Sequence, residues 1–422
     1  MQRLKQQRRL SICYVAPGHN LLPSAGPTRN TLALAEALSR SADVTVAFRR
    51  IVEAVQPRGY KIVEIDRLAA HHQNILDDAA VRGIGLREFI SYLGALRRFV
   101  REQLSSYDIV LEKSWLLSGY LTSLCQHRGV PGVVVENIAR TWNEPLQNPK
   151  DLIRCIRYWL SQKLVGRYLR EASLIIAETQ TLKDTLLQRW HISAGSIEVV
   201  GLGVDHGLFR PLDNADARRS LGISSAAKVL LYVGALDKTH DLAPILEAMC
   251  EVSDALMELH IVGDGVLKGA YERNVHNGRG NVFFHGRVSH GTVPYYIAAA
   301  DLCVAPYDLA AFPNGEIAYS TLKIPEYMAC ARPVVSVPSG HILALIEHEV
   351  SGFLFHNNVE DWVRFLSNYP SRAKLKRMGT VAASRVAAHS WESTALSYLA
   401  SCEKVLQKSC KEQITSTRCE PT

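Results

Sequence analysis

The chain has 422 residues, of which 47% are hydrophobic and 21% charged, and its formal net charge is +7 at pH 7. This composition excludes a disordered or fibrous chain, and the length favours two domains that each bury a core. No stretch approaches the roughly 20 apolar residues that span a bilayer. The nine cysteines are scattered without a Cys-x-x-Cys pair, so we expect no disulfide framework, no structural zinc and a cytoplasmic location.

The positive charge is concentrated in the first half. Residues 1–200 hold 27 Lys and Arg against 18 Asp and Glu, a balance of +9, which leaves −2 for residues 201–422. A basic first half suits an anionic acceptor or an anionic membrane surface. The alternative is a basic solvated surface without a binding function. The N-terminal MQRLKQQRRLSICYVAP has a short apolar part and no small-residue cleavage site, which favours a basic tail before a first strand over a signal peptide.

Short runs rich in Val and Ile alternate with amphipathic segments along the chain. In the first half we expect buried strands at LSICYVAP, DVTVAF, DIVLE, GVVVE and SLIIAE, and helices at residues 31–39 and 86–104. In the second half we expect strands at VLLYVG, ELHIVG, VFFHG, LCVAP and PVVSV, and helices at residues 242–252, 293–300 and 324–330. Such alternation predicts parallel sheets covered on both faces, an α/β fold.

The pattern breaks at GLGVDHGLFRPLDNAD, where glycines, a proline and polar residues precede a new strand. We therefore predict a Rossmann-like domain over residues 1–205, a second over residues 206–400 and a polar tail over residues 401–422. Ligands of open α/β sheets bind beyond the carboxyl ends of the strands, so the two domains are expected to face each other across a ligand-binding cleft.

The most informative window is STLKIPEYMACARPVVS, residues 320–336. A polar loop with Lys323 leads into a short helix that carries Glu326 in its first turn. The N–H groups and dipole of a helix start can hold a diphosphate, and Lys323 adds a positive charge. Glu326 can accept hydrogen bonds from a ribose diol. The alternative is that Glu326 only complements the helix dipole and that Lys323 is solvated.

The order of motifs in the second half resembles that of the family 4 retaining glycosyltransferases (glycosyl transferases group 1), which have the GT-B fold. The matching segments, between Leu230 and Ala400, are LLYVGALDKTH, LHIVGDGVLKG, NVFFHGRVS, AADLCVAPYD, KIPEYMACARPVVS, VSGFLF and HSW. The first-half segment GHNLLPSAGPTRNTLALAEALS is similar to the family's glycine-bearing loop before its first helix.

The resemblance implies a donor site for a nucleoside-diphosphate sugar. Glycines would let the backbone approach the phosphates, basic residues would hold the diphosphate, two residues after the FFHG turn would border the nucleobase, and an acid would hold the ribose. The residues in these positions are Gly26, Gly234, Lys238, His240, Gly263, Arg287, Val288, Glu316, Lys323, Ile324 and Glu326.

Three positions depart from the family pattern. His240 replaces a second phosphate-binding lysine, which changes the charge available to the donor. Ala318 stands where a glutamate is common, and Glu316 is the nearby acid that could reach the donor sugar instead. Leu202 replaces the Asn that is usual at the entry to the linker.

The implied reaction moves a sugar from the donor to an acceptor hydroxyl with retention of anomeric configuration, in the synthesis of a polysaccharide, glycolipid or glycosylated metabolite. Lys238 and Lys323 would stabilise the charge that develops on the diphosphate. No Asp-x-Asp occurs in the chain, so we expect neither a metal nor a cofactor. Glu112, in IVLEKSW, is a candidate to orient or deprotonate the acceptor, and His19 is a second candidate.

Two other functions share this fold: a nucleotide-sugar epimerase, and a non-catalytic homologue whose donor site has decayed. A Rossmann oxidoreductase is excluded because neither half has G-x-G-x-x-G after its first strand. We expect a carbohydrate, lipid-linked or small-molecule acceptor and no nucleic-acid partner.

A basic amphipathic segment, residues 151–173, suggests peripheral attachment to the anionic inner face of a membrane. Its basic residues are Arg154, Arg157, Lys163, Arg167 and Arg170, with Trp159 at the edge of the basic face. The apolar residues predicted to face the core are Ile153, Ile156, Leu160 and Leu164. The alternative is a core helix with a solvated outer face.

Overall fold

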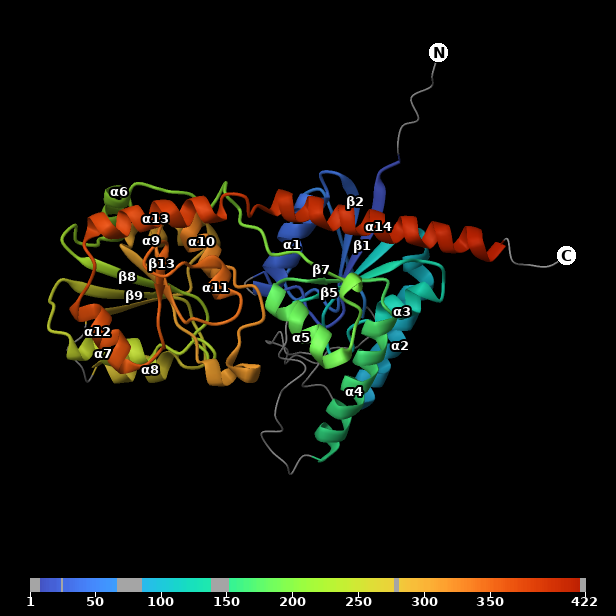
Figure 1. Cartoon of the computed structure of the whole chain (residues 1–422), viewed down its shortest axis with the longest axis horizontal. Coiled ribbons are helices and arrows are strands. Elements are labelled where there is room, and N and C mark those ends of the chain that lie inside the picture. The colour runs from blue at the N-terminus through green and yellow to red at the C-terminus, as the bar shows by residue number, and fades with distance from the viewer. Residues whose placement is uncertain (1–7, 24–25, 67–85, 138–151, 277–280, 418–422) are drawn as a thin grey trace, which may run out of the picture. The chain divides into compact units, whose positions relative to one another are not determined.

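The computed structural model describes residues 8–23, 26–66, 86–137, 152–276 and 281–417, which form two compact units. Each unit holds its own parallel sheet with helices on both faces (Figure 1). The predicted fold class, α/β with two Rossmann-like domains, is confirmed. Unit 1 comprises Met1–Gly203, Ala318–Ser320 and Trp391–Thr422, and unit 2 comprises Val204–Ile317 and Thr321–Ser390.

Unit 1 has a seven-stranded parallel sheet in the order β3-β2-β1-β4-β5-β6-β7. Helices α1 and α14 cover one face, and α2, α3 and α4 the other (Figure 1). The strands are β1 (Leu10–Ala16), β2 (Ala42–Phe48), β3 (Lys61–Glu64), β4 (Ile109–Lys113), β5 (Gly132–Glu136), β6 (Leu174–Ala177) and β7 (Ile197–Val199). The helices are α1 (Gly26–Leu38), α2 (Leu86–Gln103), α3 (Tyr120–Gln126), α4 (Leu152–Glu171), α5 (Gln180–Trp190) and α14 (Trp391–Thr417), with 3-10 turns η1 (Leu104–Ser106) and η3 (Ala194–Ser196).

Unit 2 has a six-stranded parallel sheet in the order β10-β9-β8-β11-β12-β13. Helices α7, α8 and α12 cover one face, and α9, α10 and α13 the other (Figure 1). The strands are β8 (Lys228–Val233), β9 (Met257–Val262), β10 (Val282–Gly286), β11 (Leu302–Ala305), β12 (Val334–Ser336) and β13 (Gly352–Leu354). The helices are α6 (Asn214–Leu221), α7 (Ala243–Glu251), α8 (Lys268–His276), α9 (Val293–Ala299), α10 (Lys323–Ala329), α11 (Ile342–Leu345), α12 (Val359–Ser367) and α13 (Arg372–Val386), with 3-10 turns η4 (His290–Thr292), η5 (Leu309–Ala311) and η6 (Pro313–Gly315).

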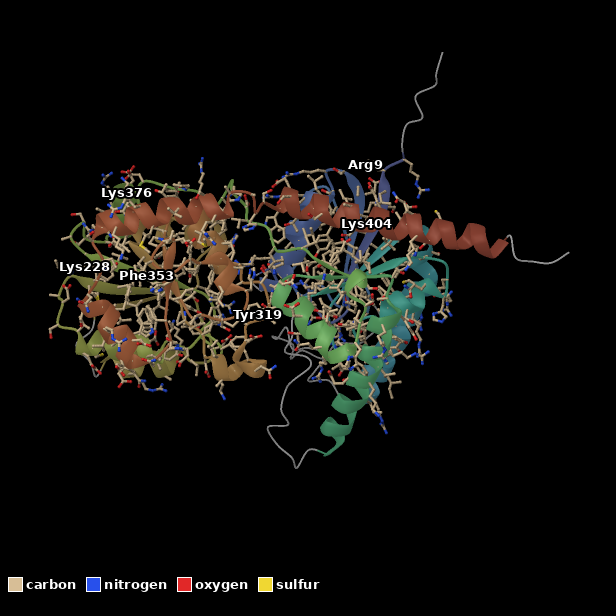
Figure 2. All side chains as sticks on the ribbon, viewed as in Figure 1. Arg9, Lys228, Tyr319, Phe353, Lys376 and Lys404 are labelled. Atoms are coloured by element: carbon tan, nitrogen blue, oxygen red, sulfur yellow. The ribbon has the colours of Figure 1, made fainter. Side chains whose placement is uncertain are left out.

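The apolar runs of the sequence form the cores of these layers. Strands β4, β5 and β6 are buried along their whole length, as expected for parallel strands covered on both faces. Side chains fill the space between sheet and helices in both units, and Phe353 lies within the core of unit 2 (Figure 2). Among the described helices, none combines the length and the apolar composition needed to cross a bilayer.

The chain returns to unit 1 at its C-terminal end. We predicted that residues up to 400 close the second domain and that a polar tail follows, but α14 is one continuous helix that packs on α1. Its buried residues Ala395, Tyr398, Cys402 and Val405 recur at helical spacing. Because these side chains form an apolar stripe, the helix is held along unit 1. The predicted junction near residue 205 coincides with the change of unit after Gly203.

The predicted inner face of α4 is wrong in the part whose side chains are described. Leu160 and Leu164 were expected in the core, but they are 48% and 41% exposed. Val165 and Leu169 are buried instead, and Gly166 lies where a β-carbon would approach the Trp190 ring to 2.4 Å. The buried face of α4 is therefore shifted by one residue, from the predicted Leu160 and Leu164 to Val165 and Leu169. The side chains of residues 152–159, including Ile153, Ile156, Trp159, Arg154 and Arg157, lie outside the described residues.

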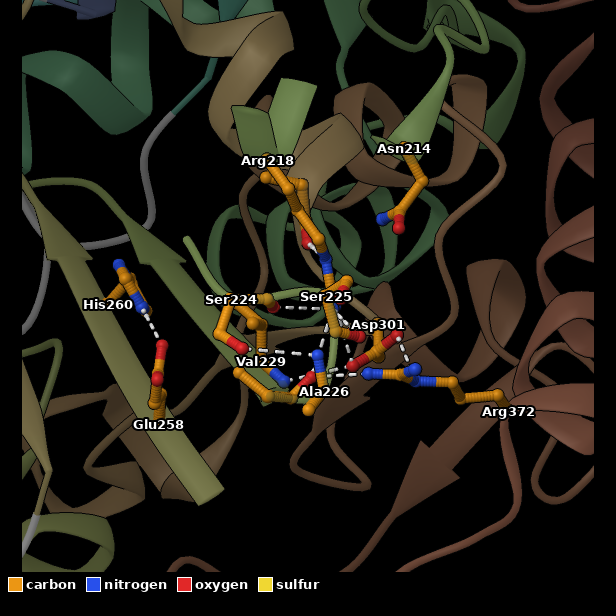
Figure 3. Close-up of polar contacts among 12 residues, drawn as sticks. Asn214, Arg218, Ser224, Ser225, Ala226, Val229, Glu258, His260, Asp301 and Arg372 are labelled. Atoms are coloured by element: carbon orange, nitrogen blue, oxygen red, sulfur yellow. Dashed lines mark hydrogen bonds and ion pairs between the residues drawn. The ribbon is translucent and has the colours of Figure 1, made fainter. Parts of the chain in front are cut away.

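A buried arginine anchors the amino-terminal side of the unit 2 sheet (Figure 3). Arg218 donates to Asp301 Oδ2 at 2.9 Å and to the carbonyl of Ala299 at 2.9 Å. Asp301 also accepts the N–H of Val229 at 2.9 Å, and Arg372 lies 3.5 Å from its other oxygen. Arg218 makes three further bonds, to the carbonyls of Ser224, Ser225 and Ala227 at 3.2, 3.1 and 3.0 Å. One side chain thus joins α6, β8 and the loop before β11.

Candidate functional site

The sheet of unit 2 reverses its strand order between β8 and β11, the position where open α/β sheets bind ligands. The loop after β8 begins at Gly234, and α10 begins at Lys323. The structure brings these two predicted residues together, because a β-carbon at Gly234 would lie 2.6 Å from Lys323 Nζ. The start of α10 has no side-chain cap, so its first-turn N–H groups are not bonded by a capping side chain.

The ammonium group of Lys323 rests on aromatic rings. Its Nζ lies 4.6 Å from the ring centre of Tyr232 and 5.6 Å from that of Tyr307, and it donates a hydrogen bond to the Tyr232 hydroxyl at 3.3 Å. Desolvation lowers the pKa of Lys323 to about 7, although the negative charges of Asp237 and Glu326 act to raise it. No described carboxylate lies within ion-pair distance of this lysine. An anionic ligand would therefore supply its missing counter-charge.

One predicted glycine, Gly263, is required by a close backbone contact at this site. A β-carbon at Gly263 would lie 1.9 Å from the carbonyl oxygen of Gly234, and the φ of Gly263 is +142°. The N–H of Gly263 donates to the carbonyl of Gly286 at 2.8 Å. The loops after β8, β9 and β10 are thus packed backbone against backbone, and only glycine fits at position 263.

His240 is held beside the same aromatic rings. Its Nδ1 lies 3.0 Å from Asp237 Oδ1, and its ring centre is 5.1 Å from that of Tyr307. Burial acts to raise the pKa of Asp237, but hydrogen bonds from His240 and Thr239 outweigh it and hold that pKa well below its usual value. The contact between Nδ1 and the Asp237 carboxylate fixes the orientation of the ring. Sequence reasoning missed Asp237, although the Asp-x-x-His spacing was a usable signal.

Glu326 lies in the first turn of α10 with its side chain 18% exposed. Its Oε1 is 4.0 Å from His290 Nε2, and the His290 ring packs on Phe209 with centres 5.3 Å apart. Among the described residues the carboxylate makes no hydrogen bond, so its acceptor capacity remains for a ligand. Sequence reasoning also missed His290, which follows the predicted base-binding residues by two positions.

The other predicted donor residues have fewer contacts. Lys238, Arg287 and Glu316 are exposed and make no hydrogen bond or ion pair with described residues, and Val288 is half-buried. Ile324 is fully buried, so it can offer a ligand only its backbone. The roles of these residues stay predictions.

Two further positions of the family pattern lie in unit 1. Gly26 is the first residue of α1, and a β-carbon there would meet no atom within 4 Å; its role also stays a prediction. Ala318 packs with Leu182 and Leu186 in an apolar cluster. A glutamate at position 318 would therefore bury its carboxylate without solvent.

The candidate acceptor base Glu112 is fully buried in unit 1. Its carboxylate accepts hydrogen bonds from Trp115 Nε1 at 2.7 Å and from the N–H groups of Gly119 at 3.0 Å and Thr122 at 2.7 Å. Burial raises the pKa of Glu112 to about 7. Through these hydrogen bonds the carboxylate stabilises the turn from β4 into α3. A catalytic role for Glu112 stays a prediction.

Two other polar groups lie in this part of unit 1. His19 is buried, with Nε2 3.4 Å from the carbonyl of Ser114. Glu136, which sequence reasoning did not single out, is fully buried at the end of β5, and burial raises its pKa to about 8. Within the described residues, no cluster of three or more His, Cys, Asp or Glu side chains could hold a metal ion.

The chain is similar in sequence and in fold to known proteins. Residues 227–369 match the family model for glycosyl transferases group 1. The D-inositol 3-phosphate glycosyltransferase of Segniliparus rotundus is 28% identical over 329 residues, which cover 74% of this chain and 70% of the relative. That of Mycolicibacterium gilvum is 28% identical over 313 residues, 71% of this chain and 67% of the relative.

Two solved structures share the fold over almost the whole chain. Sucrose-phosphate synthase from Thermosynechococcus elongatus superposes with a TM-score of 0.72 at 19% identity, covering 95% of this chain and 100% of that one. Anabaena Alr3699/HepE, solved in complex with UDP and glucose, has a TM-score of 0.65 at 16% identity and covers 94% of this chain and 99% of that one. Residues 227–369 therefore form a glycosyl transferases group 1 domain, and the chain is a glycosyltransferase with the GT-B fold.

Proposed function

We propose that the chain transfers a sugar from a nucleoside-diphosphate donor to an acceptor hydroxyl, with retention of anomeric configuration and without a metal ion. The observation that carries this proposal is the ammonium group of Lys323, held on the rings of Tyr232 and Tyr307 beside Gly234. A cation in this position would stabilise the negative charge of a diphosphate bound at the end of β8. The complex of Anabaena Alr3699/HepE with UDP and glucose supports a donor of this class.

Each group near Lys323 has a task in this reaction. As the bond from the anomeric carbon to the diphosphate breaks, negative charge grows on the leaving oxygen, and the Lys323 ammonium stabilises that charge. His240, oriented by Asp237, adds a polar ring beside the Tyr307 ring over which Lys323 lies. Glu326 accepts from the ribose hydroxyls. These interactions strengthen as charge develops, which is how binding groups accelerate a reaction.

The acceptor is a carbohydrate, a lipid-linked sugar or a small molecule that binds unit 1. The relatives that share about 28% identity are named D-inositol 3-phosphate glycosyltransferase. A phosphorylated acceptor suits the basic balance of residues 1–200.

Activity is expected to persist in excess EDTA. The proposed phosphate site consists of a lysine, a histidine and backbone N–H groups, which need no cation to stabilise a diphosphate. Release of the nucleoside diphosphate from a panel of UDP-, GDP-, ADP- and TDP-sugars measures the rate with and without chelator. Loss of that release in EDTA, restored by magnesium or manganese, would show that the site works through a metal.

Donor affinity is expected to fall as the pH rises above 7. The pKa of Lys323 is lowered to about 7 in the free protein, so below this pH the ammonium is already charged and above it donor binding must take up a proton. The KM for the donor then rises by up to about tenfold per pH unit until the lysine titrates in the complex. The variant Lys323→Arg stays charged throughout this range and should flatten the profile. A wild-type KM that is constant from pH 6 to pH 9 would contradict this assignment.

The exposed face of α4 is proposed to attach the protein to an anionic membrane. Leu160 and Leu164 are exposed beside Lys163 and Arg167, so the face offers apolar and basic side chains together. We expect sedimentation with anionic but not neutral vesicles at low salt, reversed by high salt.

A double variant tests the two leucines of this face. Leu160→Ser with Leu164→Ser should weaken vesicle binding about 30-fold, because about 2 kcal/mol of apolar burial is lost. Leu396→Ser is the matched control, since Leu396 is an exposed leucine on α14. Wild-type protein that stays in the supernatant at low salt would exclude the attachment and favour a soluble acceptor.

A further inference from the structure

Four arginines line one groove between α2 and α3 in unit 1. The groove has a volume of about 410 Å³ and no acidic residue in its lining. It opens beside Gly94, which has no side chain to fill it. The lining residues are Gly94, Arg97, Arg98, Val100, Arg101, Leu124 and Arg128.

The charge in this groove is largely unneutralised. Arg98 and Arg128 make no hydrogen bond or ion pair with the described residues, and Arg101 pairs only with the exposed Glu102 at 3.2 Å. Arg97 is held in place by Tyr120, because its Nε donates to the Tyr120 hydroxyl at 2.6 Å and its guanidinium lies 5.8 Å from that ring. The terminal nitrogens of Arg97 remain for a ligand. Guanidinium groups that lie close together without counter-charges repel one another, and a bound anion neutralises this repulsion.

The groove lies away from the edge of the sheet where the proposed chemistry takes place. Arg101 and Arg128 lie near the C-terminal ends of α2 and α3, which lead into the amino ends of β4 and β5. Substrates of open α/β sheets bind beyond the carboxyl ends of the strands. A ligand in the groove is therefore a different molecule from the acceptor that receives the sugar.

We propose that this groove is a binding site for a phosphomonoester. A phosphomonoester carries close to two negative charges and three acceptor oxygens, and the planar fork of arginine matches that group with paired hydrogen bonds. The volume is larger than one phosphate group and leaves room for the organic part of its ester. The ligand is either a free phosphorylated metabolite or the head group of a phosphatidic acid. This site does not depend on the donor site of unit 2.

The test pairs two probes with two variants. Calorimetric titration of glycerol 3-phosphate measures binding of a free phosphomonoester, and co-sedimentation measures binding to phosphatidylcholine vesicles that contain phosphatidic acid or, at equal charge, phosphatidylserine. Arg98→Gln with Arg128→Gln removes two groove charges. Arg58→Gln removes a 78% exposed charge of unit 1 whose partner, Glu36, is 3.7 Å away, and serves as the control. The melting temperature of each variant confirms that it is folded.

We expect at least one phosphomonoester probe to bind wild type and to bind the double variant at least tenfold more weakly, with Arg58→Gln unchanged. Binding of glycerol 3-phosphate identifies a free metabolite as the ligand, and binding of phosphatidic acid vesicles alone identifies the lipid. The proposal is overturned if neither probe binds, if the double variant binds as wild type does, or if phosphatidylserine vesicles show the same loss as phosphatidic acid vesicles.

Discussion

Replacing Glu326 with alanine is expected to lower kcat/KM for the donor by roughly 30- to 150-fold, which corresponds to about 2–3 kcal/mol of lost hydrogen bonding to the ribose. Among the described residues, the carboxylate lies within ion-pair distance of His290 alone, at 4.0 Å, and makes no hydrogen bond. Its removal should therefore leave the melting temperature close to that of wild type. Initial rates at varied donor concentration, with thermal unfolding of the same samples, measure both quantities.

Glu360→Ala is a suitable control for this experiment. Glu360 is 85% exposed on α12 of unit 2 and pairs with Arg364 at 2.9 Å. This substitution removes the same charge from the same unit without touching the site. Equal values of kcat/KM for wild type and Glu326→Ala would contradict the proposal that Glu326 binds the ribose.

Replacing Arg218 with methionine is expected to lower the free energy of unfolding of unit 2 by about 3–5 kcal/mol. The substitution keeps the length of the side chain but removes five hydrogen bonds, including the one at 2.9 Å to Asp301. Among the described residues, the carboxylate of Asp301 then keeps only Arg372 and the N–H of Val229 as partners. A buried charge that loses its main partner is strongly destabilising. Urea unfolding, analysed as two transitions for the two units, measures the change.

The neighbouring residue Arg219 gives a matched control. Arg219 is 77% exposed and pairs with Asp216 at 2.9 Å, so Arg219→Met should change stability by no more than about 0.5 kcal/mol. A loss of less than 1 kcal/mol in Arg218→Met would show that the network in Figure 3 does not stabilise the sheet as its geometry indicates.

Much of the donor site could be predicted because it depends on local features of the chain. Strand, glycine and helix start follow one another in the sequence, so Gly234, Lys323 and Glu326 could be placed at the ends of their elements. The aromatic support of Lys323 could not, because Tyr232 and Tyr307 lie on different strand ends that meet only in the folded sheet. The same holds for His290 on η4, which comes within 4.0 Å of Glu326 on α10 only in the folded unit.

Helix faces were harder to predict than helix positions. The segment of α4 was placed as a helix, but its apolar residues at spacings of three and four suit two adjacent faces, and packing against Trp190 selected the one that exposes Leu160 and Leu164. The assignment of α14 to unit 1 depends on contacts with α1, which lies more than 350 residues earlier in the chain. Such long-range packing leaves no local pattern in the sequence.

Unit 2 is expected to bind a nucleoside diphosphate through Lys323 without a metal. Calorimetric titration of UDP, GDP, ADP and TDP into wild type and Lys323→Ala, all in excess EDTA, tests it most directly. We expect at least one of the four diphosphates to bind wild type, with a Kd that rises at least 30-fold in Lys323→Ala, while both proteins melt at similar temperatures. Absence of binding by all four, or equal Kd values in the two proteins, would contradict it.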